Sequence, residues 1–384
     1  MMRHASVMRF ARFAGLAGLV GAVALLGACS SAPKLPDPTP LQPVPPILHV
    51  ATAWNTQIGA VPSTFQAAAA AGRVVVASSS GEVLCLQASD GRVVWRSQVA
   101  GGISGAVGSD GTFTAVVDAS NRVVSLGPQG QVLWRYQLPT SVLTPPAVFG
   151  GIVVVQGADQ HVWAFDAATG AKRWDDESTP PALLLQNGSG LVLEDGQVVL
   201  GDASGHVRAL RLADGGPVWD TALARPRGVT EVERLVGITG APAVADGVVC
   251  ARGYQSALGC LRLEDGRLLW STPADGYTGV TQNGQELVAS QADGVVQAYS
   301  VPDGKVLWHN DQLKWRRLGA PLLLGRTVAV GDLQGYVSFL DAKDGQIIGR
   351  AATDGAPIAS APLLVGNTLV VVTTKGGVYG FVPS

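Results

Sequence analysis

The sequence is poor in the residues that carry most enzymatic chemistry. Charged side chains make up 15% of its 384 residues, and the five histidines are scattered without the spacing of a metal site. It contains no Gly-x-Ser-x-Gly elbow and no glycine-rich phosphate loop with a helix behind it. These absences argue against an enzyme built on a metal ion, a nucleophilic serine or a bound nucleotide.

The first 28 residues contain no acidic side chain. Three arginines come first, and an apolar run over residues 13–26 follows that is too short to span a bilayer permanently. The run ends in Leu26-Gly27-Ala28-Cys29, which resembles the lipobox of bacterial lipoproteins. The resemblance implies that residues 1–28 are a removed signal peptide and that Cys29 carries the acyl chains of a stable anchor. The alternative is an ordinary secretory signal followed by a chance cysteine.

Position 30, after this cysteine, holds serine and not aspartate. By analogy with enterobacterial sorting, this favours the outer membrane over the inner membrane. Removal of the signal leaves 24 Lys and Arg against 29 Asp and Glu, a net charge of −5 that is not the signature of a nucleic-acid binder.

Residues 29–46 are predicted to be the acylated cysteine and a proline-rich tether. Proline blocks both helix and ladder hydrogen bonds, so a segment this rich in proline is an extended, semi-rigid spacer between lipid and folded body. The alternative is an unstructured terminus without a mechanical role. The seven prolines of the segment are Pro33, Pro36, Pro38, Pro40, Pro43, Pro45 and Pro46.

A glycine followed four residues later by tryptophan recurs along the rest of the chain. A seventh copy at 345–349 keeps the glycine and loses the tryptophan, and Trp54 stands alone before the first copy. Successive positions from 54 to 349 are 41, 39, 40, 45, 51, 38 and 41 residues apart, which indicates a structural repeat. The six complete copies are Gly91-x-x-x-Trp95, Gly130-x-x-x-Trp134, Gly170-x-x-x-Trp174, Gly215-x-x-x-Trp219, Gly266-x-x-x-Trp270 and Gly304-x-x-x-Trp308.

Each copy contains four short apolar segments separated by turn residues. In one copy these are a segment opened by a proline at 146–148, a valine run at 153–155, an alternating segment, and the tryptophan segment after a Thr-Gly turn. Such segments predict hairpin-connected strands, and four of them in about forty residues make one propeller blade. We therefore predict an all-β protein, an eight-bladed β-propeller of four-stranded antiparallel blades over residues 47–384.

The last copy supplies three strands before the chain stops. The missing fourth strand is predicted at 49–58, which carries Trp54, so the N-terminal strand joins the last blade and closes the ring. Each repeat tryptophan is interpreted as a packing residue between blades, with a tryptophan-lined ligand site as the alternative.

Three cysteines remain in the predicted propeller. Cys250 and Cys260 flank a predicted hairpin and are placed to face each other on adjacent strands; a disulfide and two small buried thiols are both open. Cys85 lies in a strand pattern and is predicted to be a free buried thiol.

The repeat resembles that of the pyrroloquinoline-quinone-dependent dehydrogenases, which are also eight-bladed propellers. An enzyme of that kind is expected to bring a vicinal disulfide, a Ca²⁺ site and a catalytic aspartate. The chain has no adjacent cysteines, and its aspartates lie mainly in turns, where they bond their own backbone. We therefore expect neither enzymatic activity nor a cofactor. The turn aspartates are Asp90, Asp214, Asp265, Asp303 and Asp344.

Two repeat spacings are long, and propeller loops carry binding while strands carry the fold. The first insertion, at 179–193, contains Leu183, Leu185 and Gln186. The second, at 224–239, contains Thr230 and Glu233 in the spacing of a helix capping box. These loops are the predicted binding sites. The alternatives are that the leucines pack under a neighbouring blade and that the charged residues are merely solvated.

The lipobox, the tether, eight quinoprotein-like blades and the segment Gly228-x-Thr230-Glu231-x-x-Arg234-Leu235 together resemble the BamB family, lipoproteins of the outer-membrane β-barrel assembly (BAM) machinery. The resemblance covers essentially the whole mature chain. It implies a periplasmic scaffold that docks on the periplasmic POTRA domains of BamA, meets other BAM subunits and assists nascent barrel proteins.

The family docks through a Leu-x-Leu-Arg segment and through acidic residues after the Arg-Leu loop. Leu183 and Leu185 match the two leucines, whereas Gln186 stands at the arginine position. The acidic positions fall at Gly237 and Thr239, so the mode of docking differs here. Trp315, in the off-repeat segment Lys314-Trp315-Arg316-Arg317, is a secondary contact candidate.

Two other functions remain open at this point. One is a lipid-anchored quinoprotein that binds a cofactor, and the other is a periplasmic propeller that binds an envelope glycan. The BamB-like scaffold on the periplasmic face of the outer membrane is the function that the loops and the anchor favour.

Overall fold

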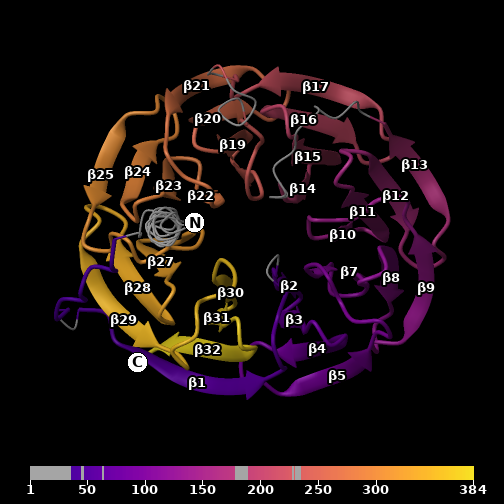
Figure 1. Ribbon diagram of the computed structural model, residues 1–384, viewed down its shortest axis with the longest axis horizontal. Helices are drawn as coiled ribbons and strands as arrows, with labels where there is room; N and C mark the ends of the chain where they lie inside the picture. The colour runs from indigo at the N-terminus through magenta and orange to yellow at the C-terminus, as the bar shows by residue number, and fades with distance from the viewer. Residues whose placement is uncertain (1–35, 45–46, 63–64, 178–188, 227–228, 230–234) are drawn as a thin grey trace, which may run out of the picture. The chain divides into compact units, whose positions relative to one another are not determined.

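The folded body is a closed ring of eight four-stranded antiparallel sheets, as predicted (Figure 1). The computed structural model describes residues 36–44, 47–62, 65–177, 189–226, 229 and 235–384. In these residues all regular structure is β-strand, and no helix is long and apolar enough to cross a membrane. In each blade the first strand is innermost and the fourth is outermost (Figure 1).

The strands follow the repeat. Blade 1 is β2 (Ala68–Ala70), β3 (Arg73–Ala77), β4 (Glu82–Gln87) and β5 (Val93–Gln98); blade 2 is β6 (Gly108–Ser109), β7 (Thr114–Val117), β8 (Arg122–Leu126) and β9 (Val132–Gln137). Blade 3 is β10 (Ala147–Phe149), β11 (Ile152–Gln156), β12 (Val162–Asp166) and β13 (Lys172–Asp176); blade 4 is β14 (Leu191–Glu194), β15 (Gln197–Gly201), β16 (His206–Arg211) and β17 (Pro217–Ala222).

The second half repeats the order. Blade 5 is β18 (Ala243–Ala245), β19 (Val248–Gly253), β20 (Ala257–Arg262) and β21 (Leu268–Pro273); blade 6 is β22 (Val280–Gln282), β23 (Glu286–Ser290), β24 (Val296–Ser300) and β25 (Val306–Asn310). Blade 7 is β26 (Leu322–Leu324), β27 (Thr327–Gly331), β28 (Tyr336–Asp341) and β29 (Ile347–Ala352); blade 8 is β30 (Leu363–Val365), β31 (Thr368–Val372), β32 (Gly377–Pro383) and β1 (Val50–Gln57).

The repeat motif joins neighbouring blades. The turn glycines have φ between 68° and 79°, a region that favours glycine, and each receives the tryptophan of the preceding blade. A Cβ on Gly266 would lie 2.6 Å from the ring of Trp219, whose indole N–H donates to the Leu263 carbonyl at 2.7 Å. The predicted packing role of the tryptophans is thereby confirmed, and the core lies between blades.

The turn aspartates behave as predicted. In the turns before the outer strands, the carboxylate of Asp90 accepts a hydrogen bond from the Arg92 backbone N–H at 3.0 Å, and that of Asp214 from the Gly216 N–H at 2.9 Å. Asp265, Asp303 and Asp344 make the same bond two residues ahead. These carboxylates therefore stabilise the turns of the repeat.

Blade 8 closes the ring with the two ends of the chain. β1 pairs antiparallel with β32, from Val50 opposite Pro383 to Gln57 opposite Gly377. Because β32 and β1 are not joined by a turn, blade 8 has no turn glycine for a tryptophan of blade 7. This explains why the seventh copy of the repeat lacks its tryptophan. Gly349 stands at the tryptophan position, and Leu48 covers it and donates its N–H to the Ile348 carbonyl at 2.9 Å.

The alternation of antiparallel strands gives the ring two different faces. Turns between first and second strands, and between third and fourth, lie on one side, here called the turn face. The opposite side, here called the connection face, carries the second-to-third turns and the links from each outer strand to the inner strand of the next blade. Insertions in those links therefore begin and end at the connection face.

The chain before β1 also lies against the ring. The Thr39 N–H donates to the Lys314 carbonyl at 3.0 Å, and the Arg350 guanidinium donates to the Gln42 carbonyl at 3.1 Å. Leu41 packs on the apolar cluster between blades 6 and 7. The described residues 39–44 and 47–48 thus lie along blade 7, with Thr39 near the connection face and Leu48 near the turn face.

Candidate functional site

Both predicted loops leave and rejoin the ring at the connection face, because both are links between blades. The first joins β13 to β14 and the second joins β17 to β18. Leu183, Leu185 and Gln186 lie outside the described residues, as do Thr230, Glu231 and Arg234. The structure therefore fixes where the two loops leave and rejoin the ring, and these points are on successive blades.

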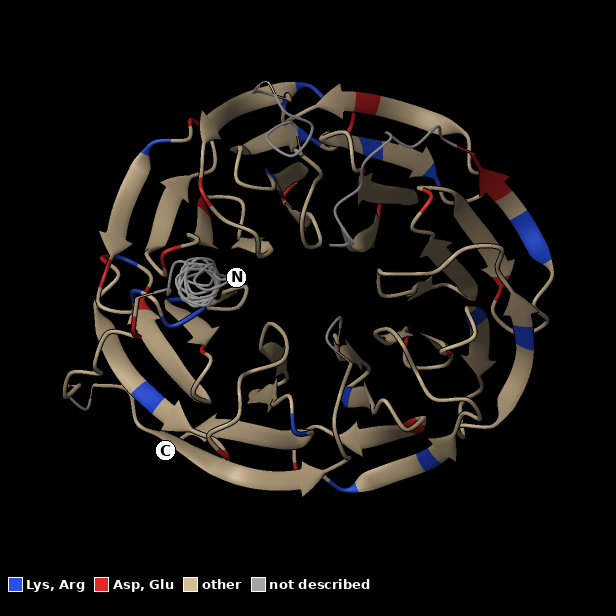
Figure 2. Cartoon of the chain, in the orientation of Figure 1, with Lys and Arg blue, Asp and Glu red and all other residues tan. Residues whose placement is uncertain are grey.

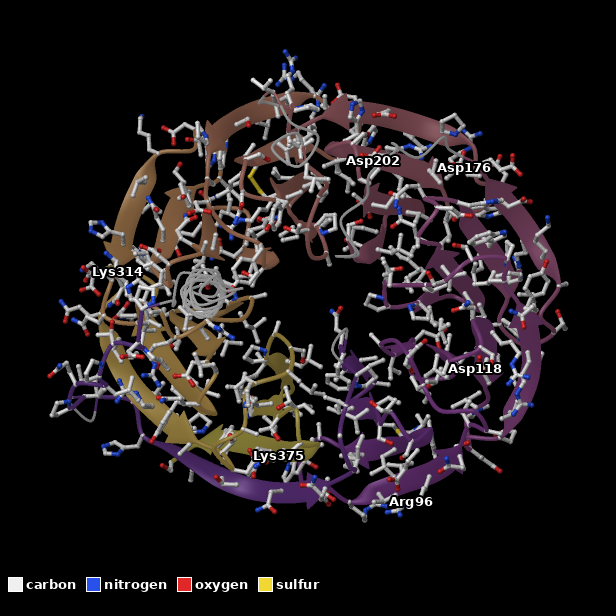
Figure 3. All side chains as sticks on the ribbon, viewed as in Figure 1. Arg96, Asp118, Asp176, Asp202, Lys314 and Lys375 are labelled. Carbon is white, nitrogen blue, oxygen red and sulfur yellow. A yellow bond between two sulfur atoms is a disulfide. The ribbon has the colours of Figure 1, made fainter. Side chains whose placement is uncertain are left out.

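The ends of the first loop are held by polar contacts. Asp176, just before the loop, accepts a hydrogen bond from Arg208 at 2.9 Å, and the two side chains are largely buried. After the loop, the buried Ser189 donates to the Gly201 carbonyl at 2.6 Å. The labelled Asp176 and Asp202 mark this side of the ring in Figure 3. Residues 178–188 thus start and end on a rigid base.

The second loop ends in a buried segment. Ile238 forms a bridge with Gly253, and the Thr239 N–H donates to the Arg252 carbonyl at 2.9 Å. Gly237 is buried, Thr239 is 2% exposed, and Leu235 is half-buried. The two positions that are acidic in the family resemblance therefore anchor the loop to blade 5 and do not form its surface. Val229, within the loop, is 96% exposed.

Arg252 is a residue that the sequence analysis missed. It is the next-to-last residue of β19, at a position where the other blades have an apolar or small residue or glutamine, and its side chain is 1% exposed. Nη1 donates to the Ser290 carbonyl of blade 6 at 2.5 Å, while Nε and Nη2 have no hydrogen-bond partner in the described part of the chain. Burial without a paired carboxylate lowers the pKa of Arg252 to about 10. The signal in the sequence was an arginine inside the apolar run at 248–253.

Unpartnered polar atoms collect around this arginine. Of the eight buried side-chain N and O atoms without a partner in the described part of the chain, six lie on Arg252 or on segments that contact it. They are Thr239 Oγ1, Arg252 Nε, Arg252 Nη2, Ser256 Oγ, Thr278 Oγ1 and Gln291 Oε1. Buried polar atoms without a hydrogen-bond partner are thus concentrated at the base of the second loop, compared with the rest of the described ring.

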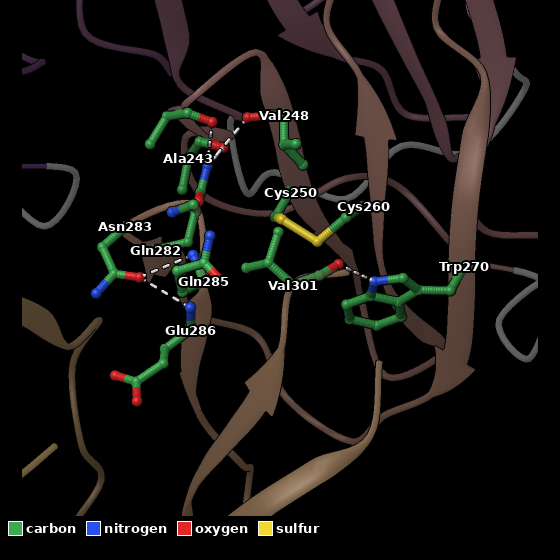
Figure 4. The surroundings of a disulfide bond; sticks show 12 residues. Ala243, Val248, Cys250, Cys260, Trp270, Gln282, Asn283, Gln285, Glu286 and Val301 are labelled. Carbon is green, nitrogen blue, oxygen red and sulfur yellow. Dashed lines mark hydrogen bonds between the residues drawn. A yellow bond between two sulfur atoms is a disulfide. The ribbon is translucent and has the colours of Figure 1, made fainter. Parts of the chain in front are cut away.

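The strand that carries Arg252 also carries a disulfide (Figure 4). Cys250 and Cys260 are directly opposite each other on β19 and β20, and they are bonded. The sequence left this pair open between disulfide and free thiols, and the structure has the disulfide. Cys85 is free and buried, as predicted, and burial raises the pKa of its thiol.

Trp315 lies on the connection face but two blade junctions beyond the second loop. It belongs to the link between β25 and β26, and its neighbour Lys314 is on the opposite side of the ring from Asp118 (Figure 3). Trp315 is 37% exposed with φ of 62°, and Arg317 is exposed with φ of 48°. Trp315 therefore lies apart from the described ends of the two loops.

Charge is spread around the ring (Figure 2). One group of possible metal ligands occurs in the described residues, His161, Asp175 and Glu177. Asp175 is already bonded to Lys172 at 2.7 Å, which lowers its pKa, and to His161 at 3.2 Å. Since His161 also stacks on Trp163, these contacts give the group a structural role.

Comparison with protein families gives a match over nearly the whole ring. The family model described as outer membrane protein assembly factor BamB matches residues 50–107, 79–310 and 292–382. A BamB from Burkholderia pseudomallei (strain K96243) is 41% identical over 348 residues, covering 90% of this chain and 91% of the relative. A BamB from Bordetella pertussis (strain Tohama I) is 33% identical over 341 residues, covering 88% of each.

Comparison with solved structures finds proteins of the same fold. The crystal structure of BamB from Moraxella catarrhalis has a TM-score of 0.78 at 27% identity and covers 87% of this chain and 99% of its own. A quinohemoprotein alcohol dehydrogenase from Comamonas testosteroni has a TM-score of 0.68 at 13% identity, over 88% of this chain and 77% of its own. At that identity the likeness concerns the propeller fold alone.

Proposed function

Because the chain belongs to the family of outer membrane protein assembly factor BamB, we propose that it is a non-enzymatic scaffold of the outer-membrane β-barrel assembly machinery. The family match, over essentially the whole ring and with relatives of that name, is the observation that carries this conclusion. A closed ring of rigid blades with insertions on one face suits a scaffold, because it holds binding loops in fixed relative positions.

The docking surface that we propose is the pair of loops on the connection face. Leu183, Leu185 and Gln186 are the contacts of the first loop, and Thr230, Glu231, Arg234 and Leu235 are those of the second. The partner is the set of periplasmic POTRA domains of BamA, with other BAM subunits nearby. Support comes from the described bases of the loops, which are held on successive blades. Leucines in a loop whose two ends are held on the ring suit a binding hot spot.

Attachment to the membrane is the second part of the proposal. Residues 1–28 act as a signal peptide, Cys29 carries the acyl chains, and residues 29–46 link it to the propeller at the periplasmic face of the outer membrane. Nascent barrel proteins are further candidate partners. The outer strands are possible contact points for them, because Val93, Leu268 and Val306 are exposed there.

Photocrosslinking in intact cells tests the docking surface. Crosslinkers at Leu185, at Arg234 and at the exposed Val229 should each trap the barrel subunit. Lys305 is the matched control, since its side chain is 81% exposed but lies in a turn of the turn face, and it should trap none. Capture of only unrelated proteins, together with normal levels of outer-membrane barrels in a deletion strain, would falsify the scaffold proposal.

A further inference from the structure

Arg316 fastens the N-terminal segment to the ring. Its side chain is 1% exposed and donates to Asp332 at 2.7 Å, to Gln334 at 2.7 Å and, through Nη1, to the Thr39 carbonyl at 3.0 Å. The Thr39 N–H in turn donates to the carbonyl of Lys314. Thr39 is therefore held through both its backbone N–H and its backbone carbonyl by one loop on the connection face.

This attachment shortens the free chain between the proposed lipid anchor and the ring. From Cys29 to Thr39 there are ten residues, which span at most about 35 Å when fully extended. If the folded body began only at Val50, the span would be about 70 Å. A chain anchored at Cys29 must therefore keep the junction between blades 6 and 7 within about 35 Å of the bilayer surface.

The loop at this junction has the side chains of a membrane-surface contact. Trp315 and Arg317 both have left-handed backbone conformations, on either side of the buried Arg316, and both side chains are exposed. Among the nine tryptophans, all of which are described, Trp315 is the exposed one. Tryptophan favours the headgroup region of a bilayer, and lysine and arginine are attracted to its phosphates.

We propose that Lys314, Trp315 and Arg317 form a phospholipid contact surface that the docked Thr39 holds next to the bilayer. The inference rests on the proposed lipid anchor at Cys29. It assigns Trp315 to the membrane and no longer to a protein partner. The two docking loops, which join blades 3 to 4 and 4 to 5, are then away from this membrane-near junction and remain open to periplasmic domains.

Quenching of tryptophan fluorescence by brominated phospholipids tests the contact. The full-length acylated chain is placed in vesicles of phosphatidylethanolamine and phosphatidylglycerol, with part of the lipid brominated near the headgroup. Quenching should occur in the wild type and be mostly lost in Trp315→Phe. Trp134→Phe, in blade 2 across the ring, is the matched control and should show the same quenching as the wild type. Equal quenching in wild type and Trp315→Phe, or none in either, would overturn the proposal.

A second variant tests the role of the tether. Thr39→Pro removes the N–H that bonds to Lys314, whereas Thr39→Ala keeps it. Thr39→Pro should reduce quenching while Trp315 is intact, and Thr39→Ala should not. Unchanged quenching in Thr39→Pro would show that the docked segment does not position the contact.

Flotation with the vesicles and labelling with palmitate separate the two possible failures. A wild-type chain that neither floats nor takes up palmitate would overturn the anchor at Cys29 and this inference with it. A chain that floats, takes up label and shows no quenching that depends on Trp315 would overturn the membrane contact alone, and the proposed scaffold function would stand.

Discussion

Two arginine side chains in the ring are equally buried and are held in opposite ways. Arg316 and Arg252 are each 1% exposed, and both lie near the connection face. Arg316 is paired with the buried Asp332 and also bonds Gln334 and Thr39. Among the described residues, Arg252 donates to the Ser290 carbonyl and is paired with no carboxylate. The same residue type thus sits in a satisfied site between blades 6 and 7 and an unsatisfied one between blades 5 and 6.

The two arginines also differ in the bonds that hold the strands and loops around them. A buried charge needs a partner because desolvation costs several kcal/mol per ion. At the first junction an ionic network supplies that partner and also fastens the N-terminal segment. Beside the second junction, the disulfide between Cys250 and Cys260, two residues from Arg252, joins β19 to β20 within blade 5. The covalent link keeps the hairpin together at the base of the proposed docking loop.

Replacing Arg316 should have the largest effect on stability. Arg316→Met leaves the carboxylate of Asp332, 3% exposed, without its counter-charge, and we expect a loss of about 3–5 kcal/mol in the free energy of unfolding. The measurement is urea denaturation followed by fluorescence. The lower end of the range is favoured, because backbone N–H groups of Gln334 and Tyr336 still bond Asp332.

The double variant Arg316→Met with Asp332→Asn is the control for this prediction. It removes both charges, so it should recover part of the loss, which is the behaviour of two coupled residues. Strictly additive losses would contradict the idea that the ion pair stabilises this junction.

Removing the disulfide should have the next largest effect. The bond closes a loop of ten residues, and its loss should cost about 2–3 kcal/mol through the entropy of the unfolded chain. The comparison is between the Cys250→Ala and Cys260→Ala double variant and the single variant Cys85→Ala, which removes a buried thiol without a crosslink. If strong reductant lowers the stability of the wild type no more than that of the double variant, the disulfide is not formed in solution.

The repeat made most of the ring predictable. The motif Gly-x-x-x-Trp encodes a contact between successive blades, so its spacing gave the number of blades, and Trp54 identified the closing strand. The loss of the tryptophan at Gly349 was visible in the sequence, but its reason was not. It depends on Leu48, which reaches blade 7 only because the chain ends meet in blade 8.

The candidate site was predictable in outline only. The long spacings located two loops, and strand alternation then places them on one face. Arg316 lies in the off-repeat segment at 314–317, where only Trp315 was singled out, and it is buried against Asp332 and Thr39, which are distant in sequence. Arg252 was not singled out, and its described partner, Ser290, is also distant in sequence. Such partners are not local, so no periodic pattern reveals them.

Arg252→Met should change stability least. Whether it raises or lowers the free energy of unfolding distinguishes the two arginines. The variant loses the bond to the Ser290 carbonyl but also removes a desolvated guanidinium with two unpartnered nitrogens. Replacing a poorly paired buried ion with an apolar residue is often neutral or stabilising, so we expect unfolding free energy within about 1 kcal/mol of the wild type or higher. At pH 7 the arginine is charged in both the folded and the unfolded chain, so the whole desolvation cost is present in the wild type. The measurement is urea denaturation of Arg252→Met and Arg316→Met under the same conditions. If Arg252→Met loses as much unfolding free energy as Arg316→Met, then Arg252 has partners in solution that satisfy its charge.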